Sequence, residues 1–436
     1  MSLPLVAIIG RPNVGKSSLF NRFLRRKIAI VDDKPGVTRD RNYALCDWNG
    51  REFYLIDTGG MIPETAKGID RLVLEQAEEA VMQADLTLFV VDCQTGIDRA
   101  DELIARRLQK SKRKVLLLVN KSDNDNVAVE RFAFYKLGLD EPYPVSANTG
   151  YGVGDALDKL VELLPHEVED KMAGDAVRIA IIGRPNVGKS SFINSLIGEE
   201  RVIVSPVPGT TRDAVDTPFE YDGKKYVLID TAGLRHKTKV KEDLEFFMTL
   251  RTLRAIEGCH VAVVLVDASE GLSVQDLKVI EDAVEARRAI VLAVNKWDLV
   301  EKDTHTAAIF TEQAKTFLGV HGHIPQIYIS ALSGQRVAKT LTLIDAVYEN
   351  WNRRIPTAEL NAFVETMVAK QPPAAIRGKY INIYYATQTD VAPPTFTFFC
   401  NHPQLLQKSY LRYIDNRLRE SYDFAGVPFR IKFKKR

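Results

Sequence analysis

One stretch of this sequence occurs twice. Four motifs appear in the same order in both copies, and the second copy begins about 173 residues after the first. Self-similarity at a fixed spacing marks a structural unit that is used more than once, so the chain is expected to contain one domain twice. The repeated motifs are VAIIGRPNVGKSS and IAIIGRPNVGKSS (Val6–Ser18 and Ile179–Ser191), PGVTRD and PGTTRD (Pro35–Asp40 and Pro208–Asp213), LIDTGG and LIDTAG (Leu55–Gly60 and Leu228–Gly233), and NKSD and NKWD (Asn120–Asp123 and Asn295–Asp298).

Each copy alternates short β-rich runs with helical patterns. Asp98 is placed to cap the start of a helix over Asp98–Gln109, because aspartate at that position accepts a backbone hydrogen bond. Buried apolar strands that alternate with helices predict an α/β fold, a mostly parallel sheet with helices on both faces. The strands expected in the first copy are Leu5–Ile9, Phe53–Ile56, Leu86–Val91, Val115–Val119 and Tyr143–Val145.

The sequence predicts three domains. The first copy occupies residues 1–164, a polar, acidic linker (PHEVEDKMAGDA) occupies 165–176, and the second copy occupies 177–351. Residues 352–436 follow the order helix, strand, strand, helix, strand, which predicts an α+β domain with its helices on one face of a three-stranded sheet. The expected elements are Thr357–Ala369, Lys379–Ala386, Thr395–Cys400, Pro403–Glu420 and Val427–Phe433.

Positive charge is concentrated in the last domain. Residues 352–436 hold 14 Lys and Arg against 6 Asp and Glu, whereas the rest of the chain holds 45 against 51. A basic domain on a mildly acidic body predicts a polyanionic partner, most simply nucleic acid.

The cysteines and the lengths of the apolar runs indicate in which cellular compartment the protein is expected. The four cysteines (Cys46, Cys93, Cys259 and Cys400) form no CxxC pair, so each is expected to pack as a small buried side chain in a reducing cytosol. The N-terminus lacks the basic start and long apolar core of a signal peptide. The longest apolar runs have the length of a strand, well short of the roughly 20 residues that span a bilayer. The sequence therefore predicts a soluble cytoplasmic protein.

GRPNVGKS at Gly10–Ser17 and Gly183–Ser190 matches the phosphate loop G-x-x-x-x-G-K-S. Its glycines let backbone N–H groups turn around phosphate oxygens, and the following helix presents its positive end to them. Lys16 and Lys189 are expected to reach the β- and γ-phosphates, and Ser17 and Ser190 to bind Mg²⁺. The alternative, a tight glycine turn without function, does not explain two occurrences between a strand and a helix.

The NKxD motifs identify the base. Asp123 and Asp298 are expected to accept hydrogen bonds from guanine N1–H and the 2-amino group, a donor pair that adenine lacks. Adenine would leave a buried carboxylate unpaired, so the site favours GTP over ATP. Asn120 and Asn295, with the stems of Lys121 and Lys296, brace the base and the loop. Backbone N–H groups near Ala147 and Ala331, within SAN and SAL, suit guanine O6.

The segments between these motifs predict two switches. Thr38 and Thr211 are placed to bind Mg²⁺ and the γ-phosphate, Asp57 and Asp230 to hold Mg²⁺ through water, and Gly60 and Gly233 to donate a backbone N–H to the γ-phosphate. Loss of the γ-phosphate would release both segments. The alternative for each threonine is a turn residue without a role.

The predicted nucleotide-binding residues, taken together, come from the phosphate loop, the DxxG segment, the NKxD motif and the SA dipeptide of each copy. They are Gly10, Arg11, Pro12, Asn13, Val14, Gly15, Lys16, Ser17, Ser18, Asp57, Thr58, Gly59, Gly60, Asn120, Lys121, Asp123, Ser146 and Ala147 in the first copy, and Gly183, Arg184, Pro185, Asn186, Val187, Gly188, Lys189, Ser190, Ser191, Asp230, Thr231, Ala232, Gly233, Asn295, Lys296, Asp298, Ser330 and Ala331 in the second.

Two domains with GRPNVGKS, PGxTRD, DTxG and NKxD, followed by a small basic module, resemble the bacterial EngA (Der) double GTPases over essentially the whole chain. That resemblance implies a factor in assembly of the large (50S) ribosomal subunit, whose nucleotide state controls binding to the ribosome. It also implies a KH-like C-terminal domain packed against the GTPase domains. Three self-contained domains favour a monomer.

The resemblance also bears on hydrolysis. Many small GTPases place a water-orienting glutamine directly after DxxG, but Met61 and Leu234 stand there in this chain. Related GTPases use an asparagine of the phosphate loop to hold K⁺ near the bridging phosphate oxygen, which implies that role for Asn13 and Asn186. The alternative is an asparagine chosen for turn geometry. A basic cluster after Gly233 (Arg235, His236, Lys237, Lys239 and Lys241) is either a contact for RNA or a solvated helix face.

RNA binding by the last domain needs a surface of its own. A KH domain clamps RNA with a GxxG loop, and residues 352–436 contain only Gly378 and Gly426. Phosphate contacts are expected from Arg377, Lys379, Arg412, Arg417, Arg419 and Lys432–Arg436. Tyr384, Tyr385, Phe396, Phe398 and Phe399 form either a stacking platform or part of the core.

Two other classes of GTPase share the asparagine phosphate loop or its chemistry. An enzyme of tRNA modification would need a folate- or flavin-handling domain and a reactive C-terminal cysteine, and KFKKR at the C-terminus supplies neither. A membrane-remodelling GTPase would need a transmembrane or strongly amphipathic basic helix outside the core, and no such pattern is found.

Overall fold

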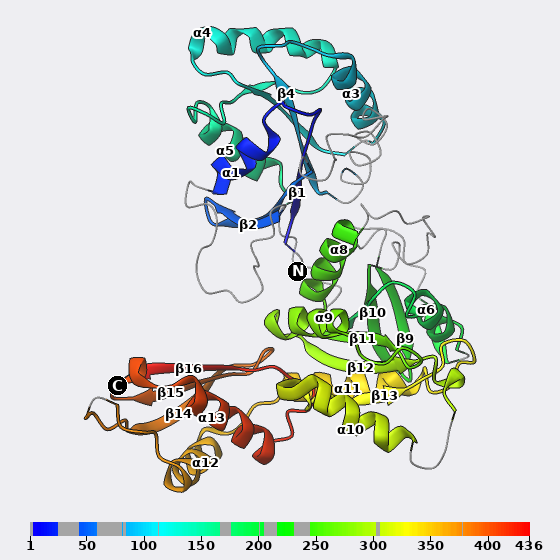
Figure 1. The fold of residues 1–436 in the computed structure, drawn as a ribbon, viewed down its shortest axis with the longest axis vertical. Helices are drawn as coiled ribbons and strands as arrows, with labels where there is room; N and C mark the ends of the chain where they lie inside the picture. The colour runs from blue at the N-terminus through cyan, green and yellow to red at the C-terminus, as the bar shows by residue number, and fades with distance from the viewer. Residues whose placement is uncertain are drawn as a thin grey trace. The chain divides into compact units, whose positions relative to one another are not determined.

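The protein is described here by a computed structural model that covers residues 3–24, 43–58, 81, 84–111, 113–165, 176–199, 201–204, 216–230, 245–301, 306–376 and 378–436. The chain divides into two compact units, residues 1–169 with 240–250 and residues 170–239 with 251–436. Each unit is described by itself (Figure 1).

The first unit is built on a six-stranded sheet in the order β2-β3-β1-β4-β5-β6. All neighbouring strands are parallel except the hairpin β2–β3, which is antiparallel. Figure 1 shows α1 and α5 on one side of β1 and β4, and α3 on the other. The elements are β1 (Leu5–Ile9), α1 (Lys16–Phe23), β2 (Tyr43–Trp48), β3 (Arg51–Asp57), β4 (Leu86–Asp92), α3 (Arg99–Ser111), β5 (Val115–Asn120), α4 (Asp125–Ala128), the 3₁₀ helix η3 (Val129–Leu137), β6 (Tyr143–Pro144) and α5 (Val153–Leu163).

The core of this unit follows from the strand alternation. Val6, Ile8 and Leu88 point to the face where Leu19 of α1 and Leu157 of α5 pack, and all five are fully buried. Alternate strand residues point to the opposite face, where α3 buries Ile104 and Leu108. Burial on both faces explains why β1 and β4 consist almost entirely of apolar residues.

The second unit repeats this plan with seven strands in the order β13-β12-β11-β7-β10-β9-β8. Strands β8, β9 and β10 pair antiparallel and the others parallel. The elements are β7 (Val177–Ile182), α6 (Lys189–Ile197), β8 (Val202–Val204), β9 (Thr217–Tyr221), β10 (Lys224–Ile229), α8 (Glu245–Gly258), β11 (Val261–Asp267), α9 (Val274–Glu285), β12 (Ala289–Asn295), η5 (Trp297–Leu299), α10 (Thr306–Leu318), η6 (Gly319–His321), β13 (Gln326–Tyr328) and α11 (Lys339–Trp351). Residues 245–250 of α8 are grouped with the first unit and the rest of the helix with the second.

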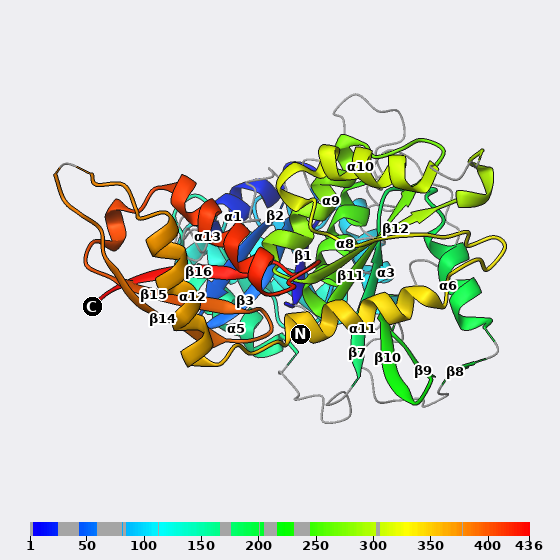
Figure 2. The ribbon, with the colours of Figure 1, turned by 90° about the horizontal axis from the view of Figure 1, so that it is seen from below.

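A third sheet, β14-β15-β16, forms the C-terminal module of the second unit. Helices α12 and α13 cover one of its faces, where Phe396 and Phe398 are fully buried against Leu360 and Leu418 (Figure 2). The module consists of α12 (Thr357–Lys370), β14 (Ile383–Asp390), β15 (Thr395–Cys400), η7 (Pro403–Leu405), α13 (Lys408–Ser421) and β16 (Arg430–Lys435).

The C-terminal module and the seven-stranded sheet share one hydrophobic core, which runs from β7 and β11 through α11 to α12, β15 and α13. Gly426 joins the two parts through its backbone. Its oxygen accepts a hydrogen bond from Ile290 N at 2.7 Å, and its N–H donates to His323 O at 3.1 Å. A Cβ on Gly426 would lie 2.4 Å from Ile290 O, so only glycine fits this contact at φ +68°.

The fold class predicted from the sequence is confirmed, and so is the helix–strand–strand–helix–strand order of the last module. Asp98 Oδ1 accepts a hydrogen bond from Ala100 N at 2.8 Å, as expected of a residue that caps α3. The boundaries of β14 were wrong, because the strand starts at Ile383 rather than Lys379. Residues 379–382 instead pair locally, through the isolated bridge between Ile376 and Lys379 and the hydrogen bond from Asn382 N to Asn401.

All four cysteines are free and buried, which confirms their expected role as small core side chains. Burial raises the pKa of Cys46 and of Cys259 to about 12, so neither thiol is a reactive nucleophile. Within the described ranges, no helix is long and apolar enough to cross a membrane.

Candidate functional site: two nucleotide-binding pockets

The phosphate loop connects β1 to α1 in the first unit and β7 to α6 in the second. Gly10 and Gly183 have φ values of +152° and +141°, and a Cβ on either would lie 2.3 Å from a backbone oxygen, that of Val90 or Leu265. The neighbouring strand therefore touches the loop at a point that only glycine allows. The loop leads into α1 or α6, and the N-terminus of a helix directs backbone N–H groups and positive partial charge toward an anion.

The loop lysine folds back over its own loop. Lys16 Nζ donates to Gly10 O and Arg11 O, both at 2.8 Å. Lys189 Nζ does the same in the second unit, to Gly183 O at 2.8 Å and Arg184 O at 2.6 Å. Burial lowers the pKa of each lysine to about 8. An ammonium group held among carbonyl oxygens is ready to exchange these partners for phosphate oxygens.

The asparagine of NKxD connects the two ends of the pocket. Asn120 Nδ2 donates to Val14 O of the phosphate loop at 2.7 Å, while its Oδ1 accepts from Ala147 N at 3.0 Å. Asn295 repeats both contacts, with Val187 O at 2.8 Å and Ala331 N at 2.9 Å. The side chain is almost fully buried in both copies, so phosphate loop and base loop are fixed to one another.

The backbone of the NKxD lysine is in the left-handed conformation, with φ +66° at Lys121 and +60° at Lys296. Lys121 Nζ lies 2.6 Å from Asp92 Oδ2, and Lys296 Nζ lies 2.5 Å from Asp267 Oδ2. These pairs hold the aliphatic stems straight, as a surface for the flat face of a base.

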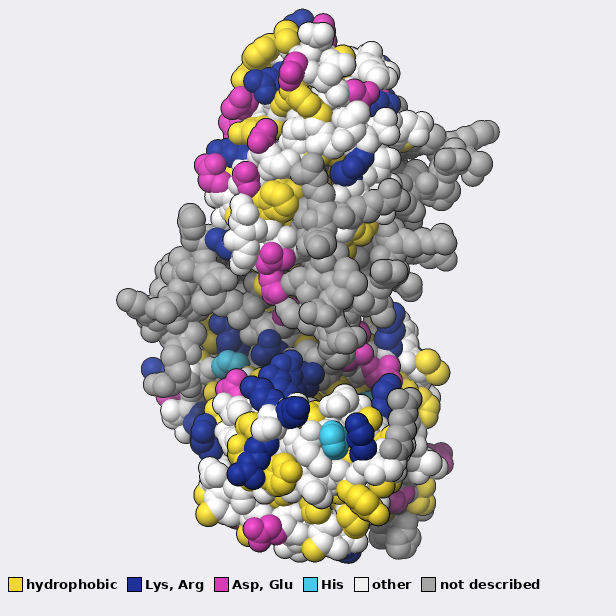
Figure 3. All heavy atoms as spheres, turned by 90° about the vertical axis from the view of Figure 1, so that its left-hand side faces the viewer, with side chains coloured by type: hydrophobic (Ala, Val, Ile, Leu, Met, Phe, Trp, Pro, Cys, Tyr) yellow, Lys and Arg dark blue, Asp and Glu magenta, His cyan; other side chains and the backbone are white. Residues whose placement is uncertain are grey.

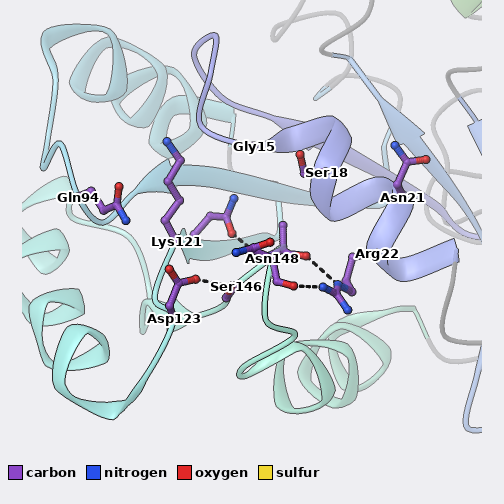
Figure 4. Close-up of a pocket in the computed structure, with 11 residues that line it drawn as sticks. Gly15, Ser18, Asn21, Arg22, Gln94, Lys121, Asp123, Ser146 and Asn148 are labelled. Carbon is purple, nitrogen blue, oxygen red and sulfur yellow. Dashed lines mark hydrogen bonds between the residues drawn. The ribbon is translucent and has the colours of Figure 1, made fainter.

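A cavity of about 510 Å³ opens between these motifs in the first unit (Figure 4). Ser146 Oγ donates to Asp123 Oδ1 at 2.6 Å, so the carboxylate of NKxD points to the base loop. The cavity is large enough for a nucleoside. Its lining residues are Gly15, Ser18, Asn21, Arg22, Gln94, Asn120, Lys121, Asp123, Ser146, Ala147 and Asn148.

A buried carboxylate anchors the arginine of each phosphate loop. Asp101 accepts from Arg11 Nε at 3.2 Å, and Asp276 accepts from Arg184 Nε at 2.8 Å. Both aspartates are fully buried and also accept the backbone N–H that precedes their own helix.

Sequence reasoning missed these two anchors and also Asp92 and Asp267. Asp276 follows Asp101, and Asp267 follows Asp92, by about 175 residues, the spacing of the NKxD motifs. Comparison of the two copies would therefore have revealed these residues.

The Mg²⁺ side of the pocket is described only in part. Asp57 is buried at the end of β3, and its charge acts on Lys16. Thr58 Oγ1 donates to Ile8 O at 2.8 Å. Ser17 and Ser190 are exposed in the first turn of their helices. Oxygen ligands of this kind suit Mg²⁺. Outside the described residues lie Thr38, Gly59, Gly60, Thr211, Thr231, Ala232, Gly233 and the basic cluster at 235–241.

Basic side chains gather on the C-terminal module, on the face shown in Figure 3. The exposed ones include Lys379, Lys408, Arg412, Arg430, Lys432, Lys434, Lys435 and Arg436. Arg419 was expected to contact phosphate, but it is bound internally. It pairs with Asp415 and donates to Phe424 O and Val427 O, both at 2.9 Å.

The five aromatic residues of this module are divided between two environments. Phe396 and Phe398 belong to the core, whereas Tyr384 and Tyr385 are exposed. The ring of Tyr385 stacks on that of Phe399, with centroids 4.5 Å apart.

Two family profiles match this chain. One is described as "50S ribosome-binding GTPase" and matches residues 5–121 and again 178–296. The other is described as "KH-domain-like of EngA bacterial GTPase enzymes, C-terminal" and matches residues 354–434. The two matches to the first profile include both phosphate loops and end at the asparagine and lysine of the NKxD motifs.

Several proteins called GTPase Der are similar over their full length. The one from Caldanaerobacter subterraneus subsp. tengcongensis is 48% identical and that from Moorella thermoacetica is 48% identical, each alignment covering 100% of this chain and 99% of the relative. The one from Desulforamulus reducens is 47% identical with the same coverage.

Proposed function

This chain belongs to the GTPase Der (EngA) family and is a GTPase with two GTP-binding domains, and from that premise we propose that it acts in assembly of the large (50S) ribosomal subunit. Nucleotide state in the two domains would control when the protein binds the subunit. The proposal rests on one combination, two nucleotide pockets on the same chain as a basic KH-like module. The setting is the bacterial cytoplasm, and the acting species is a monomer.

The proposed domains run over residues 1–164, 177–351 and 352–436, with the linker at 165–176. In each pocket the loop lysine would bind the β- and γ-phosphates, and the NKxD aspartate the guanine N1–H and 2-amino groups. Mg²⁺ supplies charge neutralisation on the phosphates when bound, held by Ser17, Thr38 and Asp57 in the first domain. Ser190, Thr211 and Asp230 would hold it in the second.

K⁺ stimulation is proposed for both domains through Asn13 and Asn186. The two residues are exposed, and both have φ +64°, a left-handed conformation that asparagine tolerates better than most residues. That geometry is also what a purely structural asparagine would show, so the test must keep the backbone conformation while it removes the side chain that would bind K⁺. Glycine does this, since it adopts positive φ without strain.

Asn13→Gly and Asn186→Gly are therefore compared with the wild type for GTP hydrolysis in K⁺ and in Na⁺. We expect faster hydrolysis in K⁺ for the wild type, and for each variant a loss of the K⁺ effect in the altered domain only. Equal rates in K⁺ and Na⁺ for the wild type would contradict the proposed K⁺ site.

Ribosome binding is tested by cosedimentation with purified large subunits in K⁺ buffer, with GDP or a non-hydrolysable GTP analogue. We expect binding in one nucleotide state, and the variants Lys16→Ala and Lys189→Ala to identify the domain that controls it. Equal binding with GDP and with the GTP analogue would contradict the proposal that the nucleotide controls binding to the subunit. No binding in any state would leave a double GTPase with a different partner.

The basic module supplies a second test of the same proposal. Lys432, Lys434 and Lys435 are exposed on β16, so replacing them with glutamine removes charge without touching the core. We expect weaker cosedimentation with a smaller dependence on salt, because fewer phosphates are neutralised. Glutamine at Lys224, a surface residue of β10, is the matched control.

A further inference from the structure

We propose that Arg22 is a positioning residue for guanine in the first GTPase domain, and that the second domain, with Ser195 at that position, releases guanine nucleotides faster. The inference rests on the proposed guanine contacts of the base loop, Ser146–Asn148.

Arg22 connects the end of α1 to this loop. Its Nε donates to Ala147 O at 2.7 Å, and its guanidinium also donates to Asn148 O (Figure 4). Two hydrogen bonds from one planar cation to consecutive carbonyls fix the orientation of the peptide groups between them.

Those peptide groups are the ones that face the base. In a trans peptide the C=O and the N–H point in opposite directions, so holding Ala147 O directs the N–H of Asn148 to the other side of the loop. Ala147 and Asn148 line the cavity together with Asp123, so a base held by Asp123 is expected to place its O6 near their peptide groups. Asn120 fixes only the Ala147 N–H, which leaves the next peptide group to Arg22.

The same helix also holds the phosphates. Helix α1 begins at Lys16, and Arg22 lies in its last turn. One short rigid element would therefore set the distance between the phosphate end and the base end of the nucleotide.

The second domain provides an internal comparison. Ser195 occupies the corresponding position of α6, and its side chain is too short and uncharged to replace the guanidinium contacts. The other fixed point of the base loop is kept, since Ala331 N donates to Asn295 Oδ1 at 2.9 Å. The two pockets thus share the asparagine contact and differ at the arginine.

The test uses the full chain with Asp298→Asn, which directs the second domain to xanthine nucleotides and leaves guanine nucleotides to the first. Release of a fluorescent GDP is measured by stopped flow for Arg22→Ala, Arg22→Lys and Arg106→Ala. Arg106 is exposed on α3 and serves as the matched arginine control. We expect Arg22→Ala to release GDP about tenfold faster, since two charge-assisted hydrogen bonds are lost.

A second readout separates positioning from general loosening. 6-Thio-GDP keeps N1–H and the 2-amino group but replaces O6 by a weaker acceptor, whereas inosine diphosphate keeps O6 and loses the 2-amino group. Arg22→Ala should reduce the preference for GDP over 6-thio-GDP and leave the preference over inosine diphosphate unchanged. Arg22→Lys, which keeps the charge, should fall between the wild type and Arg22→Ala.

The gain-of-function variant is Ser195→Arg in a chain that carries Asp123→Asn, and it should slow GDP release from the second domain. Unchanged release and unchanged selectivity in Arg22→Ala would overturn the role of Arg22. A fall in both selectivities together with a lower Tm would also overturn it, by showing a structural role. A wild type that does not distinguish GDP from 6-thio-GDP would remove the O6 contact itself, and this inference with it.

Discussion

Asp276 Oδ1 lies 2.8 Å from Arg184 Nε, and the other oxygen of the same carboxylate accepts the N–H of Ser273 at the start of α9. One fully buried side chain thus holds both the phosphate loop and the cap of a helix. Asp101 does the same for Arg11 and the start of α3.

Asp276→Asn should therefore destabilise the second unit. The substitution removes the buried charge partner of Arg184 and leaves only the exposed Glu270, 3.1 Å from the guanidinium, which should lower the free energy of unfolding by about 2 kcal/mol. Urea unfolding followed by circular dichroism measures the change. Glu312→Gln, which breaks the exposed pair with Lys315, should change that free energy by less than about 1 kcal/mol. Equal effects of the two substitutions would contradict the anchoring role.

Nucleotide affinity should fall in mild alkali. Burial lowers the pKa of Lys16 and of Lys189 to about 8, and a bound phosphate would favour the charged amine and raise that pKa again. Above pH 8 the free protein must therefore take up a proton to bind. Between pH 7 and pH 8.5 the affinity of each site should drop about fourfold, as expected for a group of pKa about 8.

Isothermal titration with GDP in buffers of different ionisation enthalpy reports this proton uptake directly. Lys189→Ala should remove the pH dependence of the second site along with most of its affinity. A flat affinity between pH 7 and pH 8.5 in the wild type would show that the lysine is already fully charged in the free loop.

Base selectivity should reverse in one domain at a time. Asp123→Asn replaces an acceptor by an amide, which can donate to the 2-oxo group of xanthine and no longer accepts both donors of guanine. The affinity of the altered domain for GTP should fall by a factor of about 10⁴, because guanine leaves its buried polar groups unpaired. Its affinity for xanthosine triphosphate should rise. Equilibrium titration with both fluorescent nucleotides measures the change, and Asp298→Asn is the same test for the second domain. Retained GTP affinity in either variant would contradict the assignment of that aspartate.

Gly426 should tolerate no side chain. Gly426→Ala places a Cβ 2.4 Å from Ile290 O at φ +68°, so the variant combines an unfavourable backbone conformation with a steric clash. The free energy of unfolding should therefore fall by about 3 kcal/mol. Gly378→Ala has a similar φ of +72° and nothing within 4 Å, so it should cost about 1 kcal/mol. Thermal unfolding of the full chain compares the two. A smaller effect at Gly426 than at Gly378 would show that the backbone contact between module and GTPase domain contributes nothing.

The sequence predicted the buried parallel strands well, because their signal is local. The nearly unbroken apolar sequences LVAII in β1 and LTLFVV in β4 identify strands covered on both faces, whatever their neighbours. Edge strands carry no such signal. The edge strands β2 (YALCDW) and β8 (VIV) are short and show no polar–apolar alternation, and their place in the sheet is set by antiparallel pairing with β3 and β9.

The candidate site was predicted where motifs fix spacing along the chain, and missed where contacts join distant segments. Lys16 and Asn120 could be named from their motifs. The pairing of Arg11 with Asp101 spans 90 residues, and nothing local to either residue indicates it. Arg22 was overlooked for the same reason, since its acceptors lie 125 and 126 residues away.

The single core that extends from β11 through α11 into α12 and β15 has a consequence for how such a chain can change over time. A domain whose hydrophobic core is formed by its own residues alone can be transferred between genes as a unit. The last 85 residues cannot, because Trp351 and Ile355 at the junction are buried in a core to which both sides contribute. Any exchange of this module must carry the matching surface of the second GTPase domain with it, so the two are inherited as a pair.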